Sequence, residues 1–211
     1  MLGRTHMMLG ALVGVVMTAN APGLGMLEGA AIGAIAGLMP DLDHPNSTLT
    51  RKVAPISLGS RKISLALIAL GVIKLAWDGW LPWHQVGMIA LWALIAALSP
   101  HRGITHSLIG LLFATYGLMG WLGPLWTVFA AAYLSHLVAD MLTDGGVPLL
   151  WPWKFDFHIP TGLHTGRFFT RMIEKGIQLV ASLAIVGGLI LHFNDFVRLA
   201  LSQVQHLQKI F

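Results

Sequence analysis

The chain has 211 residues, of which 55% are hydrophobic and only 10% are charged, and its formal net charge is +4. With a mean hydropathy of +0.72, this composition excludes an ordinary soluble domain, in which about 25% of residues are charged. It favours one integral membrane domain over residues 1–211. The lack of cysteine excludes disulfides and thiolate metal sites. No basic face with interleaved aromatic residues predicts nucleic-acid binding.

Apolar segments of helical length predict an all-α, polytopic membrane protein with about seven membrane helices. Several segments are shorter than the ~20 residues of a full crossing. Such helices are tilted little, are extended by flanking residues, or enter only part of the bilayer. In chain order the predicted helices are Met7–Asn20, Leu24–Met39, Ile63–Trp77, Gln85–Leu98, Ser107–Leu122, Leu125–Met141 and Gly176–Phe193.

Turn residues predict how two pairs of these helices are connected. Ala21-Pro22-Gly23 and Gly123-Pro124 indicate tight helical hairpins. Glycines at four-residue spacing, such as Gly29 and Gly33, favour close approach of helix backbones. The stretch 194–211 is amphipathic, and we expect it to lie outside the membrane.

The distribution of basic residues predicts the orientation. With a cytoplasmic N-terminus and every helix crossing, all Lys and Arg residues except Lys74, Arg198 and Lys209 fall on the cytoplasmic side. The expected location is therefore the bacterial inner membrane, with several passes. Tryptophans would form an outer aromatic belt (Trp77, Trp80, Trp83, Trp121, Trp126) and an inner one (Trp151, Trp153).

Four short stretches near the ends of apolar segments hold nine of the 19 His, Asp and Glu residues. In this topology all four face the cytoplasm, which predicts one shared site within residues 1–155. Ionisable groups at a bilayer are costly and usually functional, and clustered His and Asp residues are typical of a divalent metal site. The stretches are Arg4–His6, Pro40–Pro45, His101–Ser107 and His136–Asp144.

His136 and Asp140 lie four residues apart on a predicted helix, so their side chains share one face and can bind one ion. Asp144 continues this stripe for another turn before Gly145 and Gly146 end the helix. The alternative is a polar helix end at the membrane interface.

Asp41, Asp43 and His44 lie between two prolines, which limit the backbone and favour an extended conformation. In an extended stretch Asp41 and Asp43 point the same way. The pair would bridge two metals, or one aspartate would ligate while the other acts as base. A charged turn with helix-capping aspartates is the alternative.

In the third stretch, Thr105 or Ser107 can cap the next helix, which places His106 in its first turn. Arg102 is a candidate for holding an anionic group, because a guanidinium pairs bidentately with phosphate or carboxylate. Three roles are open for His101: a metal ligand, a residue that hydrogen-bonds to a ligand, or an interface residue.

Other histidines differ in the support they have. His6 stands alone in its stretch, and only its shared side of the membrane favours it as a ligand. His158 and His164 are more simply interpreted as loop residues, and His84, His192 and His206 as residues of the outer interface.

The motifs together resemble the bacterial LexA-regulated, membrane-bound metal-dependent hydrolases of the inner membrane. This resemblance implies a helical membrane fold, metal-dependent hydrolysis and control by LexA, the repressor of the SOS response, but no particular substrate. The matching elements are Thr5-His6, Pro40-Asp41-Leu42-Asp43-His44-Pro45, 101–107, 133–143 and 145–152.

The predicted chemistry is hydrolysis by metal-activated water, on a phosphoester, or less favourably an ester or amide, of a lipid or other amphiphile. Zinc is favoured, as one or two ions, and manganese or iron stay open. The predicted partners are the bilayer and this amphiphile. A metal or ion transporter and a regulatory protein with a structural metal are the alternatives. Predicted ligands are His6, Asp41, Asp43, His44, His106, His136 and Asp140, and predicted catalytic residues are Asp43, Arg102 and Asp144.

Overall fold

The structure is a computed structural model, and it describes residues 2–21, 25–43, 61–98, 102–153, 155–164, 167–193, 197–198 and 201. These residues are helical or irregular, with only two isolated β-bridges between 143 and 163. The predicted all-α class is therefore confirmed for the described part of the chain. Most of the predicted amphipathic stretch 194–211 lies outside it.

Each of the seven predicted helices overlaps an observed α-helix. The last helix begins eight residues earlier than predicted, because its first turns contain Arg171, Glu174 and Lys175, charged residues that form helices well. The observed helices are α1 (Gly3–Met17), α2 (Gly25–Leu38), α4 (Arg61–Trp77), α5 (Trp83–Leu98), α6 (Leu108–Leu122), α7 (Trp126–Met141) and α8 (Phe168–Leu191).

Helix length does not support seven full membrane crossings. Among the described residues, two helical stretches are long and apolar enough to cross, Leu108–Met141 and Phe168–Leu191. The first of these contains α6 and α7, which are separated by the 3-10 turn η3 (Gly123–Leu125). A helix of 15 residues, such as α1, spans only about 22 Å at ~1.5 Å per residue.

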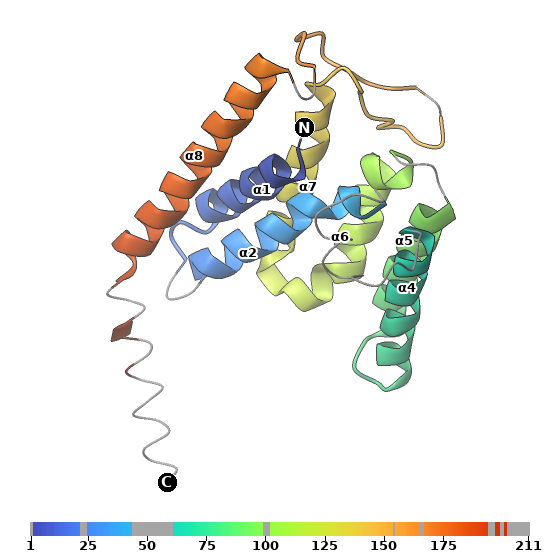
Figure 1. Cartoon of the computed structure of the whole chain (residues 1–211). Coiled ribbons are helices and arrows are strands. Elements are labelled where there is room, and N and C mark those ends of the chain that lie inside the picture. The colour runs from blue at the N-terminus through green and yellow to red at the C-terminus, as the bar shows by residue number, and fades with distance from the viewer. Residues whose placement is uncertain are drawn as a thin grey trace.

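The helices pack in a row of neighbours. α8 lies on α1, the α1–α2 hairpin lies on α7, and the series continues through α6 and α5 to α4 (Figure 1). Within the first hairpin, a Cβ on Gly10 would overlap the carbonyl oxygen of Gly33. The predicted close approach of these two helices through glycine is thus confirmed.

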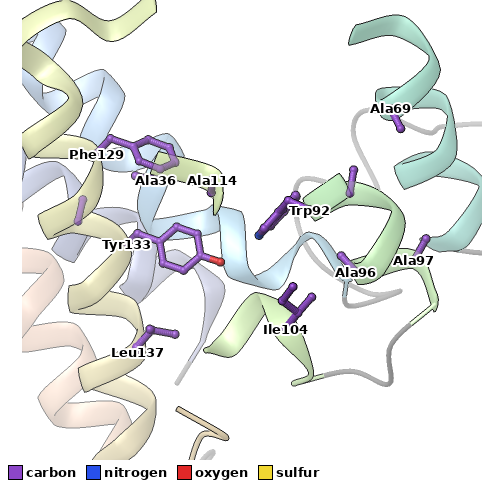
Figure 2. Packing of buried hydrophobic residues seen from close by; sticks show 12 residues of the cluster. Ala36, Ala69, Trp92, Ala96, Ala97, Ile104, Ala114, Phe129, Tyr133 and Leu137 are labelled. Atoms are coloured by element: carbon purple, nitrogen blue, oxygen red, sulfur yellow. The ribbon is translucent and has the colours of Figure 1, made fainter. Parts of the chain in front are cut away.

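An apolar core fixes the centre of this row (Figure 2). Trp92 of α5, Phe129 and Tyr133 of α7, and Ile104 between the helices are all at most 2% exposed. Ile104 belongs to the 3-10 turn η2 (Ile104–His106), and the Tyr133 hydroxyl donates to the Thr105 carbonyl. The core therefore fixes the turn that carries His106.

Candidate metal centre

The site is built on the last two turns of α7. The side chains of His136 and Asp140 are 0% and 4% exposed. The Nδ1 of His136 lies 2.8 Å from the carbonyl oxygen of Gly37 at the end of α2. Because a carbonyl only accepts, Nδ1 carries the proton and the Nε2 lone pair faces the centre of the site.

Two other elements, η2 with His106 and the 3-10 helix Met39–Asp43 with Asp41, bring further ligand atoms to this point. His106 Nε2 lies 3.3 Å from His136 Nε2 and 3.7 Å from Asp140 Oδ2. Asp41 Oδ1 lies 3.7 Å from His106 Nε2 and 3.9 Å from His136 Nε2. Together with the 3.8 Å between His136 Nε2 and Asp140 Oδ2, these five distances outline a cage in which an oxygen of Asp41 and an oxygen of Asp140 each lie near both imidazoles.

The cage fits one divalent ion. Ligand bonds of about 2.0–2.1 Å in a tetrahedral site separate the ligand atoms by roughly 3.3–3.4 Å. The observed separations of 3.3–3.9 Å are equal to or slightly larger than this. Two imidazoles and two carboxylates are also a donor set that zinc, manganese and iron accept.

His6 lies beside the cage and contacts its ligands. Its ring stacks on that of His136 with centroids 3.8 Å apart. Its Nε2 lies 3.1 Å from Oδ1 of Asp140, the oxygen that does not face His106. His6, His136 and Asp140 also form a possible three-ligand group, but it shares His136 with the group of Asp41 and His106. Since one lone pair binds one ion, the two groups compete for His136.

Arg102 holds the other side of Asp140. Its terminal nitrogens lie 3.4 Å from Asp140 Oδ2 and 3.1 Å from the carbonyl oxygen of Gly146. Arg102 adopts a φ of 60°, a left-handed conformation that is unfavourable for a residue with a side chain. A Cβ on Gly145 would overlap the guanidinium. Arg102 was predicted to hold an anionic group, and the group it contacts in the structure is the carboxylate of Asp140.

His106 is oriented by its neighbours in the chain. Its Nδ1 lies 3.0 Å from the Thr105 hydroxyl, which leaves Nε2 directed at the cage. Ser107 caps α6 by accepting from the backbone N–H of Gly110, as the sequence predicts. His106 itself lies in the 3-10 turn before this cap and not in the first turn of α6.

Asp41 is the most accessible of the cage residues, with a side chain 21% exposed. Burial raises the pKa of its carboxyl, but the hydrogen bond with His106 and the charges of His136, His106 and His6 outweigh this and hold the pKa well below its usual range. Asp41 is therefore an anion at neutral pH, as a ligand requires.

The predicted extended conformation of this segment is wrong, because Met39–Asp43 forms the 3-10 helix η1. Residues two apart on such a helix do not share a face, so the extended geometry that paired Asp41 with Asp43 in the sequence analysis is absent. The side chain of Asp43 and the whole of His44 lie outside the described residues, and their predicted roles stay predictions. The same holds for His101.

Asp144 does not join the cage. α7 ends at Met141, where the Thr143 hydroxyl donates to the carbonyl of Asp140, so the predicted extra turn is absent. The Asp144 side chain is 50% exposed and lies 2.6 Å from His164 Nδ1. His164, interpreted from the sequence as a loop residue, thus partners an acid outside the site.

Several residues that position the ligands carry no sequence signal for that role. Gly37 acts through its carbonyl, Thr105 through its hydroxyl and carbonyl, and Gly145 through its missing side chain. Every residue has a backbone carbonyl, so the sequence does not indicate that the carbonyl of Gly37 contacts His136. Only the folded structure shows this contact. The Gly145-Gly146 pair is the one visible hint.

Comparison with known proteins gives matches over most of the chain. Residues 1–195 match the family described as YdjM inner membrane protein. The chain is 34% identical over 130 residues to the inner membrane protein YdjM of Escherichia coli (strain K12) and of Shigella flexneri. It is 24% identical over 184 residues to the uncharacterized protein YvsG of Bacillus subtilis (strain 168), covering 86% of this chain and 92% of that protein.

The alignment with the two YdjM proteins covers 58% of this chain and 48% of theirs, so the chain spans about half the length of these curated relatives. No solved structure matches the chain.

Proposed function

We propose a function from one premise: the chain belongs to the YdjM inner membrane protein family, the LexA-regulated, membrane-bound metal-dependent hydrolases that its motifs resemble. On this premise, the protein is a multi-pass enzyme of the bacterial inner membrane. It hydrolyses a phosphoester of a lipid or other amphiphile at the cytoplasmic membrane boundary. An ester or amide of such a molecule is the less favoured substrate.

The observation that carries the proposal is the cage of His106, His136, Asp41 and Asp140. Its ligand atoms come from three turns or helices far apart in sequence, and five of their six separations are 3.3–3.9 Å. Burying two imidazoles and a carboxylate without a cation would be unfavourable. We infer that the cage holds one divalent ion, with zinc favoured and manganese or iron as the alternatives.

A divalent ion held there would activate a water molecule and polarise a phosphoryl or carbonyl oxygen. The protein residues have separate tasks. His6 and Arg102 hold the two oxygens of Asp140 in place. Asp41 and Arg102, with side chains 21% and 28% exposed, lie on the accessible side of the cage. Substrate therefore approaches past Arg102, whose charge attracts an anionic head group.

Exposed tryptophans support a proposal for the membrane arrangement. Tryptophans at the α4–α5 turn (Trp77, Trp80, Trp83) and beside the α6–α7 turn (Trp121, Trp126) are 40–77% exposed. Both turns lie lower in Figure 1 than the ends of α1, α2 and α7 that carry the ligands. Tryptophan is enriched at membrane interfaces. We propose that these turns face the periplasm and that the cage faces the cytoplasm.

The test combines metal analysis with an activity screen. Purified protein is analysed for metals and then assayed against phospholipids, lysophospholipids and isoprenoid phosphates, with fatty-acid esters and amides as comparison. Wild type should bind about one ion per chain and release a product that His136→Ala and Asp41→Ala do not. Full metal content and full activity in both variants would refute the site.

A regulatory protein with a structural metal is the second candidate, and the completeness of the cage favours it. Four protein ligands close a tetrahedral zinc site, whereas catalytic zinc usually keeps a position open for water. Six-coordinate manganese or iron would leave two positions open with the same four ligands. Water exchange at the bound ion, measured by proton relaxation with Mn²⁺, separates the enzyme from the structural site.

Ion transport has less support. Both possible metal-binding groups in the described part of the chain lie at the same end of the bundle and share His136. A transport path would need ligands farther along the helices.

A further inference from the structure

A second site lies between α1, α2 and α8. A cavity of about 340 Å³ is lined there chiefly by Arg4, Met7 and Met8 of α1, Leu38 of α2, and Gln178 and Ser182 of α8. Its volume is within the range of about 300–1,000 Å³ that is typical of small-molecule sites.

This cavity is separate from the metal centre. Successive residues of an α-helix are rotated by about 100°, so Arg4 and Met8 project from the side of α1 opposite to His6. His6 faces α7, where it contacts His136 and Asp140, whereas Arg4 and Met8 face the space between α2 and α8. α1 therefore forms the wall between the two sites.

The lining of the cavity is suited to a hydrocarbon chain. Met7, Met8 and Leu38 are apolar, and methionine adapts its shape to irregular ligands. The cavity opens beside α8, whose residues Leu179 and Leu183 are 60% and 62% exposed on a helix long enough to cross a membrane. Exposed leucines on such a helix face lipid, so an acyl chain can enter from the bilayer.

The charge at one end of the cavity is suited to an anion. Arg4 lies in the first turn of α1, is exposed, and has no ion pair with any residue in the described part of the chain. The nearest acid along α8, Glu174, is 1% exposed and accepts a hydrogen bond from the backbone N–H of Leu2. Glu174 therefore does not line the cavity.

From this geometry we propose that the cavity binds an anionic phospholipid, with one acyl chain among Met7, Met8 and Leu38 and the phosphate at Arg4. The proposal does not depend on the hydrolysis proposed above, because the two sites lie on opposite sides of α1. The occupant is a lipid of the surrounding bilayer and not a protein segment, since the α8 residues that line the cavity, Gln178 and Ser182, are next in sequence to the exposed Leu179 and Leu183.

The test is lipid titration of the purified, delipidated full chain, followed by native mass spectrometry. Phosphatidylglycerol is compared with phosphatidylcholine of the same acyl chains. Arg4→Gln removes the charge and Arg4→Lys keeps it, while Ser182→Trp fills the cavity. Arg171→Gln and Leu179→Trp are matched controls, because both residues are exposed on α8 and neither lines the cavity. Metal content reports that each variant is folded.

Wild type should prefer phosphatidylglycerol by about fivefold, the value of one basic residue near an anionic lipid. Arg4→Gln should lose this preference, and Arg4→Lys and Arg171→Gln should keep it. Ser182→Trp should bind less of both lipids than Leu179→Trp. The proposal is overturned by a preference that survives in Arg4→Gln, by equal binding in the two tryptophan variants, or by no lipid bound to wild type. A loss of activity with unchanged lipid binding would bear only on the proposed hydrolysis.

Discussion

Charged side chains are exposed at one end of the helical bundle and buried at the other. At the α4–α5 turn, Lys74 and Asp78 form an ion pair with side chains 68% and 37% exposed. At the other end, Asp140 is 4% exposed and lies among His6, His106 and His136, which are at most 1% exposed. An exposed pair adds little to stability, whereas buried groups need compensation from partners or a cation. Only the second arrangement requires a functional explanation.

The largest difference in metal affinity should be between variants that remove a ligand and a variant that removes an acid at the other end of the bundle. His136→Ala and Asp140→Ala should each weaken metal binding by more than about 100-fold, since even residues that only support ligands contribute about 10–100-fold. Affinity is measured by competition with a chromophoric chelator. Asp78→Ala, the matched removal of an acid at the other end, should leave affinity unchanged. A similar loss in all three variants would mean that metal binding reflects general folding.

Substitution of His6 tests whether this histidine is a metal ligand. The Nε2 of His6 lies 3.1 Å from Asp140 Oδ1, the oxygen outside the cage. His6 therefore supports a ligand, and His6→Gln should lower metal affinity by about 10–100-fold without abolishing binding. The stoichiometry should stay at about one ion per chain. If His6→Gln instead halves a stoichiometry of two, His6 is a ligand of a second ion.

Substitution of Gly145 tests whether Arg102 positions the carboxylate of Asp140. A methyl group in Gly145→Ala would displace the guanidinium, so metal affinity should fall by about 10-fold, at the low end for a supporting residue. The control is Gly87→Ala, because nothing lies within 4 Å of the added Cβ there. Equal affinities in the two variants would show that Arg102 does not position Asp140.

The smallest effect should be a pH-dependent difference in thermal stability between the metal-free wild type and Asp41→Asn. The pKa of Asp41 is lowered, so its carboxylate stabilises the fold above its usual pKa of about 3.9, and this stability is lost as the pH falls through the lowered value. Asp41→Asn should unfold a few degrees below wild type at pH 7, and the difference should narrow below about pH 4. Thermal unfolding followed by tryptophan fluorescence measures this. A difference that widens in acid would show that the pKa is raised.

Much of the fold could be predicted because apolar periodicity is local. The helix positions, the glycine contact between Gly10 and Gly33 and the Ser107 cap depend on residues close in sequence or on simple spacing. The meeting of His6, Asp41, His106 and His136 was inferred from charge bias and helix order, and the structure places them together. In the structure they lie together because α1 and α2 pack on α7 and η1 packs on η2.

The expectations that proved wrong depended on backbone details. Two prolines suggested an extended segment around Asp41, but five residues form a 3-10 helix. The stripe of His136, Asp140 and Asp144 suggested another helical turn, but the pairing of Thr143 with the Asp140 carbonyl ends the helix. Arg102 has a positive φ that no sequence pattern signals. The Thr143 bond is local, whereas Arg102 contacts Asp140 and Gly146 much farther along the chain. The spacing of the ligand residues encodes neither.

X-ray absorption spectroscopy at the K-edge of the copurified metal tests the central claim most directly. The account predicts about one ion per chain with a first shell of nitrogen and oxygen at about 2.0–2.2 Å, imidazole scattering from two histidines and no sulfur. This signal should disappear in His136→Ala. A metal–metal distance of about 3.5–4 Å, or an unchanged spectrum in that variant, would contradict the single cage of His106, His136, Asp41 and Asp140.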